Sequence, residues 1–357
     1  MGTVKRTFAN NLLTSGKIDA TDALSGTIPT TNLANASLTN VTSFPPSLGG
    51  AVSSVASDPP SPNEGQMWFN TTSGALKQYS LAAGTWASGG NLNTARRYAG
   101  AAGTQTEALG FAGETATGVT AVTEEYNGTS WSSSNNMNTA REAAGGAGTQ
   151  TAALGFGGNP GPTGATESYD GTSWTEVNDL NTARYQLGSA GTQTVALGFG
   201  GYASGTNQNA TEEYDGSTWS EQNDLNTARR GTTGAGIQTA ALCFGGYSPT
   251  DYATTAEEYD GTSWTAGGTL NTGRQNLAGF GTQTAALATG GEAPSTAATE
   301  EYNGTSWTTV NPLSTARHQL SGCGTQSVGL AFGGAYPIIA NTEEWTKAVG
   351  VQTITAS

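Results

Sequence analysis

From residue 91 onward, short apolar runs alternate with short mixed segments. Each unit has an apolar run, such as Val195–Phe199, that ends in two small residues, usually Gly-Gly. A Thr-Glu-Glu-Tyr segment such as Thr211–Tyr214 and a tryptophan such as Trp219 follow. Short apolar or alternating runs bounded by glycine and polar residues predict β-strands. We therefore predict four strands in each unit: one after a recurring arginine, one in the apolar run, one in the Thr-Glu-Glu-Tyr segment and one beginning near the tryptophan.

The third and fourth predicted strands of a unit are joined by a two-residue turn signal. It occurs five times, as Asn127-Gly128, Asp170-Gly171, Asp215-Gly216, Asp260-Gly261 and Asn303-Gly304. Asn-Gly and Asp-Gly accept positive φ at both central positions of a tight turn, which makes them the strongest short signal for a β-hairpin. Five occurrences at one register predict antiparallel pairing of these two strands throughout the chain.

The unit recurs six times, at intervals of 43 or 45 residues. The phrase Asn-Thr-Ala-Arg, with small changes, places its arginine at Arg96, Arg141, Arg184, Arg229, Arg274 and Arg317. A glutamine follows nine residues later, at Gln105, Gln150, Gln193, Gln238, Gln283 and Gln326. All variation in length falls between the glycine pair and the next glutamate. A fixed period in this range, combined with predicted strands, indicates propeller blades or solenoid coils.

The order arginine, apolar strand, Gly-Gly, Glu-x-Tyr, turn and tryptophan resembles the kelch repeat. The resemblance implies an all-β fold: a six-bladed kelch-like β-propeller over residues 91–357, with four antiparallel strands per blade. An extended N-terminal segment (1–60) and a small β-hairpin module (61–90) precede it. The chain departs from the pattern at Ala112-Gly113, which replaces Gly-Gly, and in the last blade. There Gly350 stands where tryptophan is expected and Trp345 stands where tyrosine is expected.

The register also predicts how the ring closes. Trp86 lies ten residues before Arg96, the same spacing that separates each outer-strand tryptophan from the next arginine. The segment around Trp86 is therefore predicted to be the outer strand of the last blade. Val351–Ala356 is a second candidate for that strand, and the two predictions are compatible with each other.

Composition excludes several classes of function. The chain has 27 acidic and 13 basic residues, giving a net charge of -14, so neither nucleic acid nor an anionic membrane is an expected partner. No stretch is long and apolar enough to insert in a bilayer, and no secretory signal is visible. Only one histidine, His318, is present, which argues against a His-based metal site and a Ser-His-Asp triad. We expect no catalysis, no metal and no cofactor, although paired carboxylates for glycoside hydrolysis remain open.

The two cysteines, Cys243 and Cys323, replace small residues inside repeats, which predicts buried free thiols rather than a disulfide.

The recurring charges have two interpretations. They form a ring of cationic ligand anchors, or each arginine pairs with a recurring glutamate within or between blades. A charge repeated around a pseudo-symmetric ring favours pairing, because a partly buried charge needs a partner. The predicted ion-pair ring comprises Arg96, Arg141, Arg184, Arg229, Arg274 and Arg317 with Glu124, Glu167, Glu212, Glu257, Glu300 and Glu343. The tyrosine and tryptophan of each unit are predicted to pack between blades.

The segments between the second and third strands differ in every unit and are predicted to emerge on one face. They are Glu114–Val122, Asn159–Ala165, Tyr202–Ala210, Tyr247–Ala256, Glu292–Ala298 and Ala335–Asn341. Variable loops on one face of a repeat scaffold form its contact surface or are simply unconstrained. The candidate binding residues in them are Tyr202, Asn207, Asn209, Tyr247, Asp251, Tyr252 and Tyr336. Aromatic, amide and carboxylate groups suit carbohydrate.

The N-terminal region has a different character. Residues 1–60 are rich in Ser, Thr, Asn and Ala. Their apolar residues are widely spaced, and this spacing fits neither a helix nor a free-standing strand. Residues 64–86 resemble a small β-hairpin module of tailed-bacteriophage fibres, and the preceding Leu-Ser-Gly-Thr-Ile-Pro-Thr-Thr-Asn-Leu tract is similar to fibre sequence. The Gly-Thr-Gln-Thr and Tyr-Asp-Gly-Thr-Ser-Trp motifs resemble those of kelch-like repeat arrays encoded by marine phages.

These resemblances imply a virion structural protein, such as a tail fibre, collar fibre or capsid-surface appendage. Residues 1–60 would bind other virion proteins, the propeller would contact host-surface carbohydrate or a protein, and the chain would form a homotrimer. An intracellular kelch-type scaffold and a carbohydrate-active enzyme are the alternatives.

Overall fold

The structure is a computed structural model that describes residues 52–60, 66–81 and 83–353. All regular elements in these residues are β-strands. The strands form two compact units. One contains residues 83–347, and the other contains the described residues before Ala83 and after Lys347.

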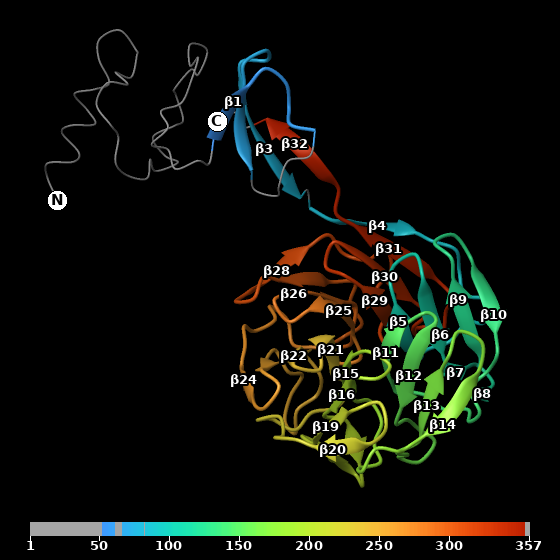
Figure 1. Cartoon of the computed structure of the whole chain (residues 1–357). Helices are drawn as coiled ribbons and strands as arrows, with labels where there is room; N and C mark the ends of the chain where they lie inside the picture. The colour runs from blue at the N-terminus through green and yellow to red at the C-terminus, as the bar shows by residue number, and fades with distance from the viewer. Residues whose placement is uncertain (1–51, 61–65, 82, 354–357) are drawn as a thin grey trace, which may run out of the picture. The chain divides into compact units, whose positions relative to one another are not determined.

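The larger unit is a six-bladed β-propeller made of six four-stranded antiparallel sheets around a common axis (Figure 1). The strands of the first three blades, innermost first, are β5 (Gly100–Gly103), β6 (Ala108–Phe111), β9 (Thr123–Tyr126), β10 (Trp131–Ser134); β11 (Gly145–Thr149), β12 (Ala152–Phe156), β13 (Thr166–Tyr169), β14 (Trp174–Val177); β15 (Gly188–Gly191), β16 (Ala196–Phe199), β19 (Thr211–Tyr214) and β20 (Trp219–Glu221). Those of the last three are β21 (Thr233–Ile237), β22 (Ala240–Phe244), β23 (Ala256–Tyr259), β24 (Trp264–Ala266); β25 (Ala278–Thr282), β26 (Ala285–Thr289), β27 (Thr299–Tyr302), β28 (Trp307–Val310); β29 (Ser321–Gly324), β30 (Val328–Phe332), β31 (Thr342–Thr346) and β4 (Thr85–Ser88). The predicted fold class and the four strands per unit are confirmed.

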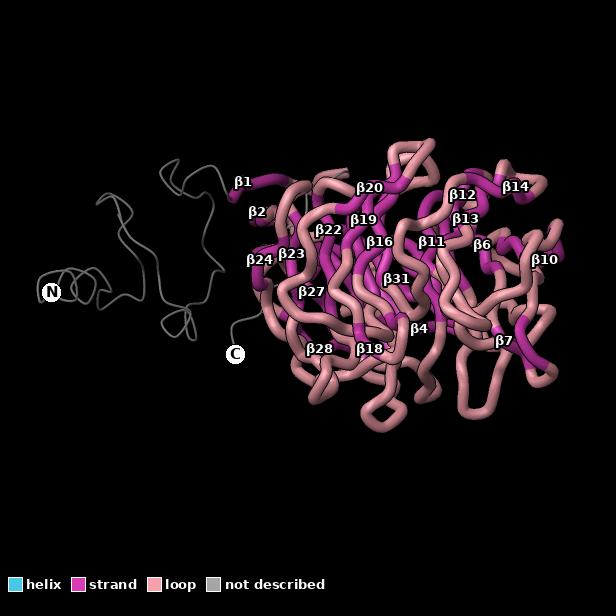
Figure 2. Tube along the Cα trace, turned by 90° about the horizontal axis from the view of Figure 1, so that it is seen from below, coloured by secondary structure: helices cyan, strands magenta, loops and turns pink. Residues whose placement is uncertain are grey.

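Two of the variable segments carry a short hairpin of their own. One pairs β7 (Glu114–Thr115) with β8 (Gly118–Val119), and the other pairs β17 (Tyr202–Ala203) with β18 (Thr206–Asn207). Figure 2 shows β7 and β18 on the same side of the propeller. We call this side the loop face.

The ring closes as the register of Trp86 predicts. Strand β4 pairs antiparallel with β31, which places Trp86 opposite Trp345, with ring centroids 5.3 Å apart. The last blade therefore takes its outer strand from the N-terminal side of the ring. Trp345 takes the position that tyrosine has in the other blades, and Trp86 packs against it as the outer-strand tryptophan packs on tyrosine there.

The second prediction, that Val351–Ala356 also forms an outer strand of the last blade, is wrong. Strand β32 (Val349–Thr353) pairs with β3 (Ala75–Leu81) of the smaller unit, and residues 354–356 lie outside the described part of the chain. The propeller consequently ends near Lys347 rather than at the expected residue 357. An isolated apolar strand does not reveal its partner, so sequence alone did not assign it to this sheet.

The smaller unit is a four-stranded sheet in the order β1-β2-β3-β32. Strand β2 (Met67–Asn70) and β3 form the predicted hairpin, and β1 (Val52–Val55) pairs parallel to β2. Trp68 is fully buried and donates from Nε1 to Asp58 (2.8 Å). Most of the predicted attachment segment, residues 1–51, lies outside the described residues.

Tryptophan and phenylalanine pack between neighbouring blades. Trp174 in the second blade lies against Phe111 in the first, with centroids 4.9 Å apart, and its Nε1 donates to Thr123 Oγ1 (3.0 Å). Such an aromatic pair adds about 0.5–1.5 kcal/mol beyond the burial of its area. Tyr126 and Trp131 are likewise buried, so the predicted packing role of these residues is confirmed.

The recurring glutamine is a second link between blades. The Gln238 amide of the fourth blade donates to Ala196 O (2.9 Å) and Tyr214 O (2.8 Å) of the third. Gln105 makes the equivalent bonds from the first blade to the last, donating to Trp345 O (2.7 Å) and Gly329 O (3.2 Å). The equivalent donors at the other four junctions are Gln150, Gln193, Gln283 and Gln326. The six-fold repeat of this residue thus serves the ring.

The predicted free thiols are present. Cys243 and Cys323 are both unpaired and buried. Burial raises the pKa of Cys243 to about 11 and that of Cys323 to about 12, so both stay protonated near neutral pH.

Candidate functional site

The recurring arginines lie in the wall of the ring, where each pairs with the glutamate of its own blade. All six arginines have relative exposures of 0 or 1%. The pairs are Arg96–Glu124 (3.3 Å), Arg141–Glu167 (3.0 Å), Arg184–Glu212 (2.5 Å), Arg229–Glu257 (2.7 Å), Arg274–Glu300 and Arg317–Glu343 (2.6 Å). We call this set the ion-pair layer. Of the two predicted arrangements, pairing within a blade is the one observed. No arginine or glutamate of this layer is exposed to solvent as a ligand anchor would be.

Each glutamate of the ion-pair layer also binds backbone. Glu212 accepts from the N–H groups of Asn181 (2.7 Å) and Thr182 (3.2 Å), which belong to the segment that leads into its arginine. Burial lowers the pKa of Arg96 to about 10, and the charge of Glu124 partly offsets that effect. A buried cation held by a carboxylate in this way fixes the loop between blades.

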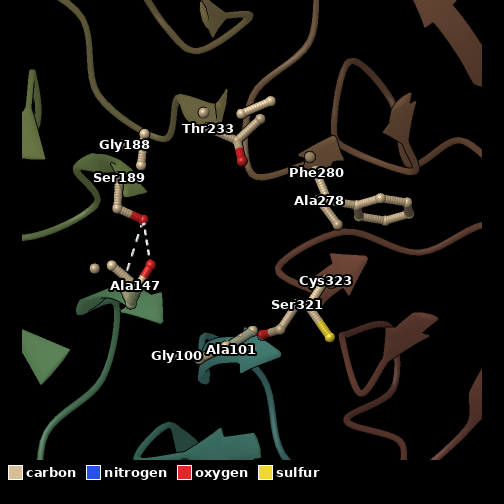
Figure 3. A pocket seen from close by; sticks show the side chains of 18 of the residues that line it. Gly100, Ala101, Ala147, Gly188, Ser189, Thr233, Ala278, Phe280, Ser321 and Cys323 are labelled. Carbon is tan, nitrogen blue, oxygen red and sulfur yellow. Dashed lines mark hydrogen bonds between the residues drawn. The ribbon is translucent and has the colours of Figure 1, made fainter. Parts of the chain in front are cut away.

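The innermost strands surround a narrow channel of about 230 Å³. Its wall is mostly glycine and alanine; the larger side chains along it include Thr233, Phe280 and Cys323 (Figure 3), three leucines, and the polar Tyr98, Gln186, Asn276 and Gln319. Ser189 Oγ donates across to Gly146 O (2.9 Å). A channel with so few functional groups offers little for recognition.

The loop-face end of the channel is closed by a ring of backbone hydrogen bonds. It is made by the residue two positions after each recurring arginine, and all six adopt a left-handed φ between 53° and 58°. The N–H donors and carbonyl acceptors run in one direction: Tyr98 to Gln319 (2.8 Å), Gln319 to Asn276 (2.7 Å), Asn276 to Gly231 (2.8 Å), Gly231 to Gln186 (2.9 Å), Gln186 to Ala143 (2.9 Å) and Ala143 to Tyr98 (2.9 Å). We call this set the mouth ring.

The Tyr98 side chain is held by two amides of the mouth ring. Its hydroxyl accepts from Gln186 Nε2 and Gln319 Nε2, both at 2.9 Å. Burial raises the pKa of Tyr98 to about 12, so the hydroxyl stays protonated. Since Gln186 and Gln319 belong to the third and sixth blades, the tyrosine links two distant parts of the ring.

The residue directly after each recurring arginine surrounds the mouth ring. It bridges to the residue that follows the glycine pair of its blade, as Arg97–Glu114, Glu142–Asn159, Tyr185–Tyr202, Arg230–Tyr247, Gln275–Glu292 and His318–Ala335. These positions share one backbone geometry but carry acids, bases, amides and aromatics. Chemical variation at fixed geometry is typical of a recognition surface on a repeat scaffold.

Seven of these twelve side chains line a cavity of about 460 Å³ at the mouth ring, which we call the basin; Arg97 and Glu114 are not among them. Its wall includes Glu142, Asn159, Tyr185, Tyr202, Arg230, Gln275 and Glu292, together with mouth-ring residues. This volume lies in the range of about 300–1,000 Å³ found for small-molecule sites. The sequence prediction included only Tyr202 from this set.

Two carboxylates of the basin have different surroundings. Glu292 accepts from Gln275 Nε2 and Asn276 Nδ2, both at 3.3 Å. Glu142 accepts from Asn159 Nδ2 (3.0 Å) through one oxygen, while its buried Oε2 has no hydrogen-bond partner. Burial raises the pKa of Glu142, the hydrogen bond from Asn159 partly offsets this effect, and the neighbouring Glu114 carboxyl raises the pKa further.

The predicted binding residues lie in three places. Tyr202 and Tyr247 lie on either side of Arg230, and Tyr252 packs on Tyr247 (5.4 Å). Tyr336 is 75% exposed, lies against His318 (4.9 Å) and lines a second cavity of about 480 Å³ with Tyr252.

The remaining three predicted side chains bond within the loops. Asn207 Nδ2 donates to Tyr247 O (2.8 Å), and Asn209 Nδ2 donates to Leu225 O (3.5 Å). Asp251 accepts from the N–H of Tyr252 (2.7 Å). These bonds shape the loops that carry Tyr247 and Tyr252.

The histidine lies in the second cavity. His318 Nδ1 is hydrogen-bonded to Ser295 Oγ (2.5 Å), and burial lowers its pKa. In the described part of the chain, no carboxylate is hydrogen-bonded to His318, and no group of three His, Cys, Asp or Glu side chains is placed to hold a metal ion. A search of the same residues finds no helix able to cross a bilayer.

Comparison with known proteins gives no family. Neither a protein-family model nor a curated protein matches the chain. Its function is therefore inferred from its own residues.

Proposed function

We propose that the chain is a structural protein of a tailed-phage virion whose propeller binds carbohydrate on the host surface. The observation that carries the binding part is the basin: tyrosine rings, amides and charged groups gather around one axis. The recurring arginines and glutamates of the scaffold, by contrast, are buried in the ring and paired with one another.

The chemistry of the basin suits a hydroxyl-rich ligand. Sugars offer apolar ring faces that pack on tyrosine and hydroxyls that bond to amides and carboxylates. Tyr185 and Tyr202 pack edge to face at 5.6 Å beside Asn159 and Glu142. Neither a nucleic acid nor a membrane fits a chain with a net charge of -14.

The virion part of the proposal rests on residues 1–86, whose amino-acid sequence resembles that of phage fibres. Residues 1–60 would bind other virion proteins, and the same resemblance favours a homotrimer. The β2–β3 hairpin agrees in position with the hairpin module of that resemblance.

Mass spectrometry of purified particles tests the virion part. The protein is expected at many copies per particle and should remain after a high-salt wash that strips adsorbed host proteins. Detection only in the infected-cell lysate would instead favour an intracellular scaffold. Release of soluble sugar from host polysaccharide by the purified chain would favour a carbohydrate-active enzyme.

A further inference from the structure

Arg230 differs from the other arginines that the structure describes. Arg96, Arg97, Arg141, Arg184, Arg229, Arg274 and Arg317 each lie within 4.0 Å of a carboxylate oxygen. Arg230 has no carboxylate within that distance, and neither a hydrogen bond nor an ion pair of its guanidinium is found among the described residues. In a chain with twice as many acids as bases, an unpaired cation is unexpected.

Two tyrosines hold Arg230 in place. Its guanidinium carbon lies 4.7 Å from the ring centroid of Tyr202 and 5.1 Å from that of Tyr247. Aromatic rings stack on guanidinium faces and leave the N–H groups at its edge free to donate. The side chain is half-buried in the wall of the basin. Its donors are therefore preoriented and unused.

Unused acceptors lie in the same basin. Glu142 Oε2 and Gln275 Oε1 are buried and have no donor. Tyr185, Arg230 and Glu142 all line this one cavity, so the cation and the carboxylate share it. The basin thus contains unmatched donors and unmatched acceptors together, and a buried polar group without a partner destabilises the fold unless a ligand satisfies it.

The combination restricts the chemistry of the ligand. A simple anion such as phosphate would satisfy Arg230, but it would meet the carboxylates Glu142 and Glu292 without donors to offer them. A simple ammonium ion would satisfy Glu142 and be repelled by Arg230. A ligand that carries a carboxylate and several hydroxyls on one ring satisfies both sides.

We propose that the basin binds an acidic sugar residue, with its carboxylate on the guanidinium edge of Arg230 and its hydroxyls donating to Glu142 and Gln275. This deepens the proposed function and rests on it, because it names the class of carbohydrate and the place where it binds. A hexuronic acid and a sialic acid share this chemistry.

Isothermal titration calorimetry on the full chain tests the proposal. The probes are trigalacturonate, 3′-sialyllactose and their neutral counterparts, carboxyl-reduced trigalacturonate and lactose. Binding is expected for at least one acidic probe, at least tenfold tighter than for its neutral counterpart. The variant Arg230→Gln should lose about 10- to 100-fold in affinity for that probe, as expected for a charge-assisted bidentate contact.

Arg97→Gln is the matched control. It removes the same charge from the equivalent position of another blade, where Glu114 already neutralises the arginine at 2.6 Å. Its affinity should stay within about twofold of wild type. An equal loss in both variants would mean that net charge, rather than a carboxylate contact, controls binding, and would overturn the proposal. Thermal melting of both variants establishes that they are folded.

The outcomes separate this inference from the proposed function. Equal binding of acidic and neutral probes would overturn the acidic-sugar assignment and leave carbohydrate binding in place. Binding to none of the four probes would overturn the acidic-sugar assignment as well. Absence of the protein from purified virions would contradict the virion role, whichever sugar the basin binds.

Discussion

Arg229 and Arg230 are adjacent in sequence, yet they belong to regions with opposite surroundings. Arg229 is fully buried and lies 2.7 Å from Glu257, and it also donates to Thr255 O (2.8 Å). Arg230 is half-buried between two tyrosines and has no acidic partner. The two residues precede β21: the side chain of Arg229 enters the wall of the ring, whereas Arg230 forms an isolated bridge to Tyr247 and its side chain lines the basin.

The same comparison applies to the recurring arginines and glutamates as a set and to the residues directly after each recurring arginine. Positions that recur in every unit form the ion-pair layer, where each guanidinium has a carboxylate of its own blade although five of the six arginines leave Nε without a partner. Positions one residue further along change from unit to unit, and Glu142 and Gln275 among them also contain polar atoms without partners. The two regions therefore differ in charge pairing: the ion-pair layer matches each cation with an acid, whereas the basin leaves Arg230 without one.

The largest predicted effect comes from making the same substitution at the two neighbours. Arg229→Gln should lower the free energy of unfolding by about 3–5 kcal/mol, because it leaves Glu257 charged and buried without its cation. Arg230→Gln should change it by no more than about 1 kcal/mol, the size of an exposed cation–π contact. Denaturant unfolding followed by tryptophan fluorescence measures both.

Glu257→Gln in the Arg229→Gln background serves as the control, since it removes the orphaned charge. It should recover part of the lost stability. Similar losses for Arg229→Gln and Arg230→Gln would contradict the division between the two regions.

A smaller effect is expected at the junction between blades. Gln238→Ala should cost about 1–3 kcal/mol, because Ala196 O and Tyr214 O lose the amide that they share. Gln222→Ala is a suitable control, since that amide bonds only to the exposed Ser220 two residues away. The midpoint of thermal unfolding compares the two, and equal midpoints would show that the recurring glutamine does not hold the blades together.

The smallest effect concerns Glu142 and has the opposite sign. Burial raises its pKa, so the folded chain binds this proton more tightly than the unfolded chain does, and the associated stability is lost as pH rises through the folded pKa. Glu142→Gln mimics the protonated state and should raise the stability at pH 7 by less than about 1 kcal/mol, since the group is only half-buried.

The gain from Glu142→Gln should vanish as the pH falls below about 4.3, the ordinary pKa of glutamate. Melting curves between pH 4 and pH 8 test this dependence. A gain that persists unchanged at pH 4 would show that the carboxylate charge is not its cause.

Much of the fold was predictable because each unit repeats the same spacing. The register of Trp86 predicted the closing strand. Trp86 has the spacing of an outer-strand tryptophan, and the last blade is the one whose own sequence lacks that tryptophan. The partner of β32 was not predictable, because a five-residue strand contains no signal for one sheet over another. The role of Gln238 was also hidden, because its acceptors are backbone carbonyls and any residue supplies those.

The contacts in the structure explain the positions at which single units depart from the repeat. Ser168 replaces the second glutamate of the second blade, and Tyr214 of the third blade lacks the carboxylate partner that Tyr259 finds in Glu213 (3.0 Å). In the last blade, Trp345 cannot donate a hydroxyl to Glu301, and Lys347 pairs with that carboxylate at 2.8 Å instead.

The candidate site was only partly predictable. The segments that differ in length contain Tyr202 and Tyr247, so the sequence predicts these two residues. Arg230, Glu142 and Gln275 lie where the length is constant, so their variation appears only when the residue after each recurring arginine is compared across units. That pattern, Arg, Glu, Tyr, Arg, Gln and His, was present in the sequence.

The closing strand has a consequence for how such chains diversify. Thr85 and Thr346 are direct partners in the last blade, so the propeller begins and ends at neighbouring points. Strands β3 and β32, which flank it in sequence, are partners in the other sheet. Recombination that replaces residues 83–347 with another closed ring would leave that pairing intact. Residues 83–347 are therefore organised as a cassette, which another ring closed at the same point could replace without breaking the β3–β32 pairing.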